Sequence, residues 1–436
     1  MALGGGTFLV QNKELPGAYI NFVSKAAATA TLSERGIATM PLELDWGKEG
    51  EIFEVTNGDF QKNSTEIFGY EYTNDKLKGL RDLFLNTQTF YAYRLNGNGK
   101  KASNDLAEAL YSGVRGNDLK IAVQVNADDE SLFDVKTLLG TDIVDEQTVA
   151  KGDDLADNKF LKWKSGITLE IAVAIPLTGG ENGEVSGADH QAYLDKAESF
   201  AFNTMGVVVT DDTTKSLYAA YNKRLRDEMG VKFQLVLYDY VKADFMGIIS
   251  VNNKPLDEGW SEASLVYWVT GASAGCAVNK SNQNRKYDGD FTVETPHTQN
   301  QLKAAIEAGK FTFHKVGTDV RVLEDINTMV TTSDTMGDIF KDNQTIRVID
   351  QIGNDIAVLF NTKYLGVVPN DAPGRISLWS DIVKHHEQLQ DIRAIENFSD
   401  ADVKVDQGDT KKSVVVTDLV TVVNAMGKLY MTVTVA

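Results

Sequence analysis

The fold of this chain is decided by the stretch Met205-Gly206-Val207-Val208-Val209-Thr210-Asp211-Asp212-Thr213-Thr214. Its apolar half predicts a buried strand, and the polar half predicts the cap of a helix that runs from Lys215 to Met229 and ends at Gly230. Val231 to Tyr238 predicts the next strand. Strand, helix and strand at this spacing are typical of βαβ units, which imply a parallel sheet.

The same pattern continues on both sides of this stretch and defines a central α/β domain at 191–290. Ala192 to Asn203 predicts a helix before it, and Ser264 to Thr270 predicts a further strand after it. An N-terminal α/β domain is predicted at 31–98. Its expected elements are strands at Gly36 to Leu44, Glu51 to Val55 and Thr89 to Leu95, and a helix at Asp75 to Asn86.

A small β domain is predicted as an insertion at 99–190. The loop residues Asn96-Gly97-Asn98-Gly99 precede it, and the Gly-rich acidic loop 179–184 follows its strands. Leu119 to Val125 and Ile167 to Ile175 alternate between apolar and polar residues, which is the period of a half-buried strand.

A C-terminal α+β domain is predicted at 291–436. The expected elements are helices at Gln299 to Ala308, Asp338 to Asn361 and Ile376 to Glu396, a hairpin of Lys310 to Lys315 with Asp319 to Glu324, and strands at Val414 to Val423 and Lys428 to Val435. The fold class is therefore a multidomain mixture of α/β and α+β, with parallel βαβ units at its core.

Both termini are predicted to be strand-bearing arms, at 1–30 and about 414–436. The last strand is complete and alternating, so it can pair within its own sheet or add to the sheet edge of a neighbour. The residues expected to make contacts between subunits are Thr7, Phe8, Leu9, Val10, Tyr19 and Ile20 in the first arm and Leu429, Tyr430, Met431, Thr432, Val433, Thr434 and Val435 in the last.

Composition excludes several classes of partner. The formal net charge of −19 argues against binding to nucleic acid or to an anionic membrane, because phosphate binding needs an excess of Lys and Arg. The single cysteine, Cys276, excludes an internal disulfide and fits a reducing cytosol. No apolar run has the length of a membrane span, and the first residues lack the features of a secretory signal.

One catalytic motif is matched by Gly271-Ala272-Ser273-Ala274-Gly275, which has the G-x-S-x-G spacing of a hydrolase nucleophile and follows a predicted strand. Three fixed positions in a Gly-rich chain arise often by chance, and no upstream glycine cluster offers an oxyanion hole. The small residues therefore favour close packing of the backbone, and Ser273 as a nucleophile is the alternative.

No cofactor or metal site is predicted. Arg94 stands where a phosphate-binding loop ending at Gly99-Lys100 needs its first glycine. The adjacent His385 and His386 point about 100° apart on a helix, which disfavours a shared ion.

A mixed-charge run, Lys223-Arg224-Leu225-Arg226-Asp227-Glu228, lies on the predicted central helix. Such a run is usually a solvated helix face with i, i+4 ion pairs. In so acidic a protein, the cations Lys223, Arg224 and Arg226 can equally form a patch that meets an acidic surface of an identical neighbour. The sequence leaves both readings open.

Seven segments carry a resemblance to a known family: Gly5 to Phe8, Pro16 to Phe22, Glu34 to Gly47, Lys223 to Gln234, Leu265 to Gly275, Lys286 to Gly289 and Lys428 to Val435. Through them, nearly the whole chain resembles the contractile tail sheath proteins of phages and phage-like bacteriocins, in particular the group typical of Gram-positive hosts. The region 99–190 resembles the family least.

The resemblance implies a structural subunit rather than an enzyme, which forms hexameric rings stacked helically around a tail tube. It also implies arms that add strands to neighbouring subunits, and contraction from an extended, metastable state that drives the tube through the target envelope. The implied partners are further copies of the chain, the tail tube, the baseplate and the tail terminator, with assembly in the host cytoplasm before incorporation into a virion or phage-like particle. The alternatives are an α/β serine hydrolase using Ser273 and, at 99–190, a β module that binds carbohydrate or a protein.

Overall fold

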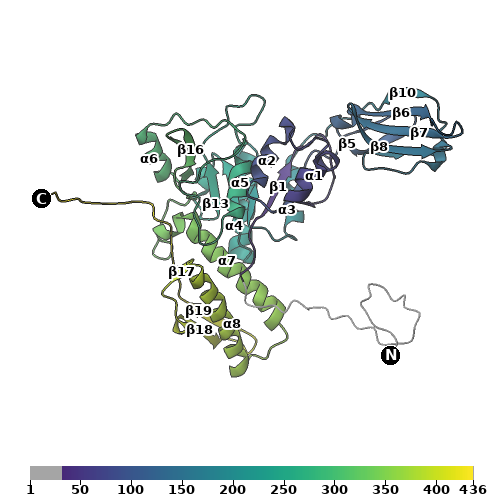
Figure 1. Ribbon diagram of the computed structural model, residues 1–436. Coiled ribbons are helices and arrows are strands. Elements are labelled where there is room, and N and C mark those ends of the chain that lie inside the picture. The colour runs from purple at the N-terminus through teal and green to yellow at the C-terminus, as the bar shows by residue number, and fades with distance from the viewer. Residues whose placement is uncertain (1–31, 436) are drawn as a thin grey trace, which may run out of the picture. The chain divides into compact units, whose positions relative to one another are not determined.

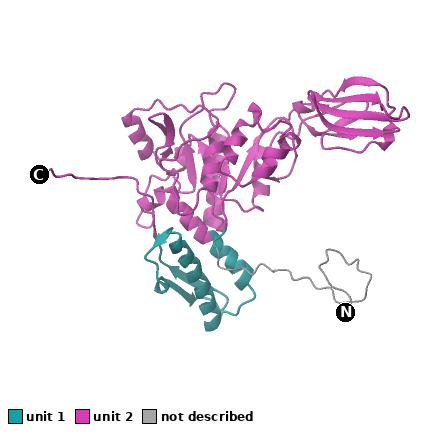
Figure 2. Cartoon of the chain, viewed as in Figure 1, with its two compact units in different colours: residues 1–33, 354–421 teal, residues 34–353, 422–436 magenta. Residues whose placement is uncertain are grey.

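The computed structural model describes residues 32–435, which divide into two compact units, residues 34–353 with 422–435 and residues 354–421 with 32–33 (Figure 2). Unit 2, which holds residues 34–353, contains a central sheet, a β-sandwich and the C-terminal arm. Unit 1, which holds residues 354–421, contains a helix and a two-stranded sheet. The long helix α7 (Asn343–Leu359) contributes residues to both units.

The central sheet has the order β14-β13-β12-β11-β1-β3-β2, and all its neighbouring strands are parallel except β2 and β3 (Figure 1). The predicted parallel βαβ core is therefore confirmed. Its strands are β1 (Ile37–Leu42), β2 (Phe53–Thr56), β3 (Thr89–Arg94), β11 (Thr204–Gly206), β12 (Gln234–Tyr238), β13 (Ile248–Val251) and β14 (Lys310–Phe311).

Helices cover both faces of this sheet. One face packs against α1 (Asn57–Phe68), α2 (Lys78–Phe84) and α5 (Val266–Gly275), and the other packs against α3 (Gly187–Ala197) and α4 (Asp212–Arg224). Asp211 caps α4 as predicted, since its carboxylate accepts a hydrogen bond from the Thr214 amide. Gly230, with φ 76°, ends the π-helical turn Leu225–Met229 that follows α4.

The predicted strand at Ser264 to Thr270 is wrong, because the chain is helical from Val266 to Gly275. The helix is buried on every side, so its sequence lacks the one-sided apolar pattern that distinguishes a surface helix from a buried strand. Its small residues allow close contact with α2. A Cβ at Gly271 would lie 2.3 Å from the Leu83 carbonyl oxygen, and a Cβ at Gly275 would lie 1.9 Å from that of Asn86.

The inserted region folds as two antiparallel sheets around a core of its own. The chain enters and leaves it through a paired stem, where Lys100 and Glu181 exchange both backbone hydrogen bonds, at 2.9 and 3.0 Å. The sandwich contains β4 (Lys101–Ser103), β5 (Ala107–Ser112), β6 (Leu119–Val125), β7 (Phe133–Leu139), β8 (Asp142–Val149), β9 (Leu161–Trp163) and β10 (Ala172–Pro176). Because α3 begins at Gly187, the predicted limit at 190 falls inside its first turns.

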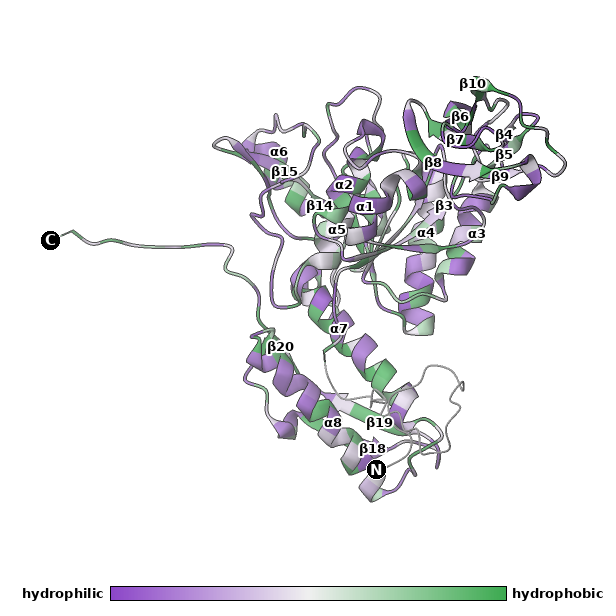
Figure 3. Ribbon diagram, turned by 45° about the vertical axis from the view of Figure 1, so that its right-hand side comes forward, coloured by the Kyte–Doolittle hydropathy of each residue, from purple (hydrophilic) through white to green (hydrophobic). Residues whose placement is uncertain are grey.

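The remaining elements follow the sequence in order. They are α6 (Gln299–Glu307), the hairpin β15 (Phe313–Val316) and β16 (Asp319–Val322), α8 (Ala372–Asp391), β17 (Ile395–Glu396), β18 (Val403–Gln407), β19 (Val414–Asp418) and β20 (Thr421–Val422). Hydrophilic and hydrophobic residues alternate along α7 and α8, as expected of helices with one exposed side (Figure 3).

Candidate functional site

The C-terminal arm, here defined as residues 426–435, is extended and exposed throughout, and it has no strand partner among residues 32–435 (Figure 1). Of the two possibilities that the sequence left open, pairing of Lys428 to Val435 within its own sheet is not seen, and the contact with a neighbour stays a prediction. Its apolar residues are nevertheless numerous, and Tyr430 is 89% exposed. The other large exposed apolar residues of the arm are Met426, Leu429, Met431, Val433 and Val435.

The root of this arm is held by the first turn of α7. The Gln344 side-chain amide donates to the Val423 carbonyl oxygen at 3.0 Å and accepts from the Ala425 amide at 3.0 Å. The Thr345 hydroxyl lies 3.2 Å from the Asn424 side-chain oxygen. We call these contacts the Gln344 clamp.

Asp342 prepares the turn that carries the clamp. Its carboxylate accepts hydrogen bonds from the backbone amides of Gln344, at 2.7 Å, and of Thr345, at 3.2 Å, so it satisfies amides that the helix itself leaves free. Burial and the nearby Asp325 carboxylate raise the pKa of Asp342, against the opposing effect of these amides.

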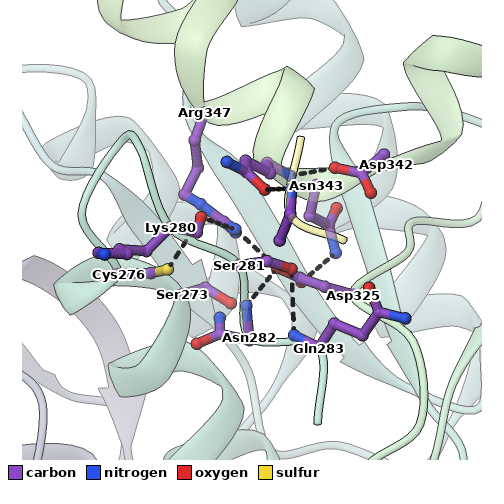
Figure 4. Close-up of polar contacts among 12 residues, drawn as sticks. Ser273, Cys276, Lys280, Ser281, Asn282, Gln283, Asp325, Asp342, Asn343 and Arg347 are labelled. Carbon is purple, nitrogen blue, oxygen red and sulfur yellow. Dashed lines mark hydrogen bonds and ion pairs between the residues drawn. The ribbon is translucent and has the colours of Figure 1, made fainter. Parts of the chain in front are cut away.

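A buried ion pair fixes the next turn of α7 (Figure 4). Arg347 donates to the Asp325 carboxylate at 2.6 Å and to the Lys280 carbonyl oxygen at 3.0 Å. Asp325 also accepts from the Asn282 amide, at 2.8 Å, and from the Asn343 side chain, at 3.0 Å. Burial alone would raise the pKa of Asp325, but Arg347 and these donors hold it below its ordinary value.

Two further contacts join α7 to the central sheet and to the turn after α4. The Gln234 side chain, on β12, donates to the Asn343 side-chain oxygen at 2.8 Å. Arg226 forms a two-pronged ion pair with Asp350, at 2.7 and 2.6 Å, and also donates to the Phe233 carbonyl oxygen. Such pairs are costly to break, because the remaining partner keeps a buried charge.

Arg226 was expected in a surface patch between subunits, and this is wrong: its side chain is fully buried and paired within the subunit. Lys223 and Arg224 are partly exposed. Lys223 donates to the Ala243 carbonyl oxygen, and Arg224 pairs with Glu198. Their part in an intersubunit patch stays a prediction.

Ser273 lies in the middle of α5, fully buried, and its hydroxyl has no hydrogen-bond partner among residues 32–435. A nucleophile elbow needs an exposed hydroxyl on a sharp turn between a strand and a helix. The geometry at Ser273 does not support the hydrolase alternative.

The histidine pair on α8 is held by separate carboxylates. His385 lies 2.9 Å from Asp355, and His386 lies 2.7 Å from Asp418. Within the described range, no group of three His, Cys, Asp or Glu residues is arranged to hold a metal ion. No helix between residues 32 and 435 combines the length and apolar character needed to cross a membrane.

A cavity of about 470 Å³ lies at the carboxyl end of β1, a common place for active sites in α/β folds. Of its four acidic lining residues, Glu43, Asp45, Asp75 and Glu258, Asp45 is engaged by the Tyr70 hydroxyl at 2.6 Å, by the Asn182 amide at 2.9 Å and by Lys76 at 3.4 Å. Burial opposes the effect of these partners, which together lower the pKa of Asp45. This carboxylate therefore ties the stem of the sandwich to the central domain.

An exposed strand edge lies in unit 1, the unit of residues 354–421. β18 pairs on one side with β19, and on the other side it has no strand partner among residues 32–435. A groove of about 400 Å³ is lined by residues of β18 and α8. Ile376 and Trp379 of α8 lie along it, and Ile376 is 63% exposed.

Four sheath domain families match the chain in consecutive segments. They are the tail sheath protein Gp18 domain III N-terminal region at 35–95, the phage tail sheath protein beta-sandwich domain at 96–182, its central domain at 183–328 and the phage tail sheath C-terminal domain at 335–436. The chain belongs to the phage tail sheath protein family. The predicted resemblance and multidomain fold class are thereby confirmed.

Two relatives from Bacillus subtilis strain 168 cover this sheath protein almost end to end. The phage-like element PBSX protein XkdK and the uncharacterized protein YqbK are each 31% identical over 98% of this chain and 99% of their own length. The tail sheath protein of the Clostridium phage phiCD119 is 24% identical over 41% of this chain and 50% of its own.

Solved structures give the same result. The sheath tail protein of Desulfitobacterium hafniense is 35% identical, with a TM-score of 0.83 over 95% of this chain and 99% of its own. That of Listeria innocua is 28% identical, with a TM-score of 0.77 over 93% of this chain and 95% of its own. The contracted helical sheath of the anti-feeding prophage is 13% identical, with a TM-score of 0.59 over 97% and 99%, and shares the fold.

Four of the functional residues, Gln344, Asp325, Arg347 and Asp350, were not predicted from the sequence. Asp342 was a recognisable signal, because an acidic residue just before a periodic apolar segment often caps a helix. The ion pairs join residues far apart in the chain, such as Arg226 and Asp350, and no local pattern predicts such partners.

Proposed function

We propose that this protein is the subunit of a contractile sheath, stacked as hexameric rings around a tail tube. Its partners are further copies of the chain, the tube, the baseplate and the tail terminator, and it is assembled in the host cytoplasm before becoming part of a phage or phage-like particle. Membership of the sheath family supports the structural role, and the free C-terminal arm carries the argument for assembly.

The arm supports strand exchange between subunits because it is a strand without a sheet. Its backbone groups make no hydrogen bond to the backbone of residues 32–425, and its apolar side chains are exposed. Addition to a neighbour's sheet would pair those groups and bury those side chains. A contact of this kind joins different surfaces on the two partners, so it does not close on itself and propagates along a helix. The predicted N-terminal arm residues, Thr7 to Val10 with Tyr19 and Ile20, lie outside the described residues and remain part of this proposal.

The β18 edge is the acceptor that we assign to an incoming arm. On its second side it has no strand partner among residues 32–435, although the Val403 carbonyl oxygen already accepts from the Trp379 indole at 3.0 Å. The adjoining groove beside Ile376 and Trp379 offers apolar surface for alternate side chains. Main-chain hydrogen bonds are insensitive to side-chain repacking, so linked subunits can rotate while their domain faces exchange partners. Contraction then needs no cofactor or nucleotide, because the free energy is stored in the assembled lattice.

The test is removal of the arm by truncation after Lys428. The shortened protein should remain folded and soluble, since residues 429–435 make no packing contact that would leave them buried. It should fail to form tubes or sheaths, as judged by negative-stain microscopy with and without the tube protein. Truncated subunits that form sheaths as stable as the parent's would overturn the strand-exchange proposal.

A point variant distinguishes the loss of strand pairing from the loss of the arm's residues. Thr432→Pro removes one backbone donor in the middle of the arm and leaves its length unchanged. Its assembly should weaken, and its thermal unfolding should match that of the unmodified protein. Equal assembly by the proline variant would indicate that the arm binds through its side chains instead.

A further inference from the structure

The Gln344 amide acts on the root of the arm as a neighbouring strand would. It accepts from the backbone amide of Ala425 and donates to the backbone carbonyl of Val423, both at 3.0 Å. One planar amide supplies one acceptor and two donors at a fixed spacing, whereas an ionised glutamate supplies acceptors alone. Gln344 is 2% exposed, so its side chain cannot sample other orientations freely.

The clamp is continuous with the buried contacts beneath it. Asn343, the preceding residue, accepts from Gln234 on β12 and donates to Asp325. Arg347, one turn further along α7, pairs with the same Asp325 carboxylate (Figure 4). The hydrogen bonds of Gln344 to the arm's root and of Asn343 to the central sheet are therefore joined directly through the backbone of α7.

The chain beyond the clamp has no such support. The side chains from Met426 to Val435 are exposed, and this arm makes no backbone hydrogen bond to residues 32–425. Beyond it, Gly427 lies beside the Gln283 side chain and Lys428 acts on Glu324 by charge alone, so the clamp is the last point at which hydrogen bonds to the described residues hold the arm's backbone. At about 3.3 Å per extended residue, the segment after it can reach roughly 30 Å.

We infer that Gln344 is the positioning residue that sets the exit of the C-terminal arm and transmits tension from a neighbour's sheet to the central sheet. This inference rests on the proposed strand exchange. A fixed exit lowers the ordering cost of binding, because the residues at the root are immobilised before the neighbour arrives. It also makes the central domain follow when the neighbour pulls on the arm.

The test compares Gln344→Ala with the surface control Gln299→Ala, which changes the same residue type at an exposed position of α6. In the unassembled subunit, hydrogen exchange at the Ala425 amide should accelerate in Gln344→Ala alone. The concentration needed for assembly should rise by about tenfold or more, since two hydrogen bonds to the arm are lost. Unchanged exchange at Ala425 would overturn the inference.

Ala425→Pro tests the clamp from the arm's side and leaves α7 intact. It removes the donor that Gln344 accepts from, so it should reproduce the assembly defect of Gln344→Ala without lowering the melting temperature. Normal assembly by both variants, when truncation after Lys428 abolishes assembly, would refute the clamp and retain strand exchange. Normal assembly by the truncated protein would refute strand exchange itself.

Discussion

Ser273 and Gly275 lie two residues apart on α5, but Ser273 lacks a hydrogen-bond partner whereas Gly275 lacks space for a side chain. The Ser273 hydroxyl is buried without a hydrogen-bond partner in the described part of the chain, so its oxygen gains nothing from folding. The Gly275 Cα faces the Asn86 carbonyl oxygen so closely that a Cβ would lie 1.9 Å from it. The motif thus serves the packing of α5 on α2.

Alanine substitutions at these two positions should therefore differ sharply. Ser273→Ala should change the free energy of unfolding by less than about 1 kcal/mol, because it removes an unsatisfied hydroxyl. Gly275→Ala should destabilise by about 3 kcal/mol or more, because backbone must move. Thermal unfolding of both variants provides the comparison.

The hydrolase alternative has its own test. Ester hydrolysis should be undetectable in the unmodified protein and in Ser273→Ala. Loss of a measurable esterase activity in Ser273→Ala would restore the hydrolase alternative.

Asp82, at the α2 side of the same core, should give the protein a measurable pH dependence. Burial raises the pKa of Asp82 to about 6 from 3.8, although the Tyr287 hydroxyl and the Asp290 amide both donate to its carboxylate. The folded protein then binds this proton more tightly than the unfolded chain does. The stability that the group contributes is present in acid and is lost as the pH rises from about 4 through 6.

Asp82→Asn should remove that part of the pH dependence. Melting temperatures measured at several pH values between 4 and 7 should fall less steeply with rising pH in the variant than in the parent protein. The difference between the two profiles isolates Asp82 from the other carboxylates, which titrate in both proteins. Parallel profiles would show that Asp82 titrates alike in the folded and unfolded chains.

At the scale of elements, exposed residues that line the groove between β18 and α8 can be substituted without destabilising the isolated subunit. Ile376→Glu places a charge on a side chain that is 63% exposed, so the isolated subunit should keep its melting temperature. Assembly should weaken, because a neighbour's arm would have to bury that charge. Ile143→Glu, at a 53% exposed position of β8 in the sandwich, is the matched control and should assemble normally. Equal assembly by the two variants would exclude this groove as the acceptor.

The elements that the sequence predicted well were those with local signals at their ends. The helix α4 has Asp211 before it and Gly230 beyond its final π-helical turn, and both residues act as predicted. The helix α1 was missed although Thr56 and Asp59 form a capping box, a pattern that could have revealed it. Helix α5 and strand β13 are buried throughout, and their apolar runs do not distinguish the two states.

The candidate site was predictable in one part only. The alternating pattern from Leu429 to Val435 indicated a strand before any partner was known, and the structure shows that this segment is exposed. The residues that hold its root lie about 80 positions away in the chain. Nothing in the sequence distinguishes Gln344 from any other polar residue of a helix. Contacts between residues so far apart in the chain depend on how the core folds, and a single sequence contains no pattern that predicts them.

At the scale of the whole molecule, the β-sandwich is connected through a single paired stem. Besides the Lys100–Glu181 pairing, the Gly183 amide donates to the Asn96 carbonyl oxygen at 3.1 Å. Trp46 of the central domain packs against Phe160 in the sandwich core, with ring centroids 6.1 Å apart. Further contacts join the sandwich to the rest of this unit: Arg94 donates to the Ser112 carbonyl oxygen at 2.9 Å, Arg115 donates to that of Gly69 at 2.6 Å, and Lys159 pairs with Glu66 at 2.8 Å. A replacement removes these partners as well as the aromatic contact.

Replacing Lys101 to Gly180 with a short Gly/Ser linker should leave the central domain folded, because the stem already holds the ends of the removed segment together. The variant should include Trp46→Gln, which avoids exposing the indole. It should retain α3, whose His190 lies 2.8 Å from the Tyr218 hydroxyl and which truncation at 190 would damage. Sheath formation around the tube should persist. Its loss in a variant with a normal folded core would place the sandwich among the lattice contacts.

The stem has a practical consequence. A chain that leaves the core and returns to it through adjacent, hydrogen-bonded segments can carry an unrelated cargo, provided the cargo's own ends lie close together. A small enzyme or an affinity module grafted between Lys100 and Glu181 would then be repeated once per subunit at a regular spacing. The protein would become a scaffold for displaying such modules along a nanotube.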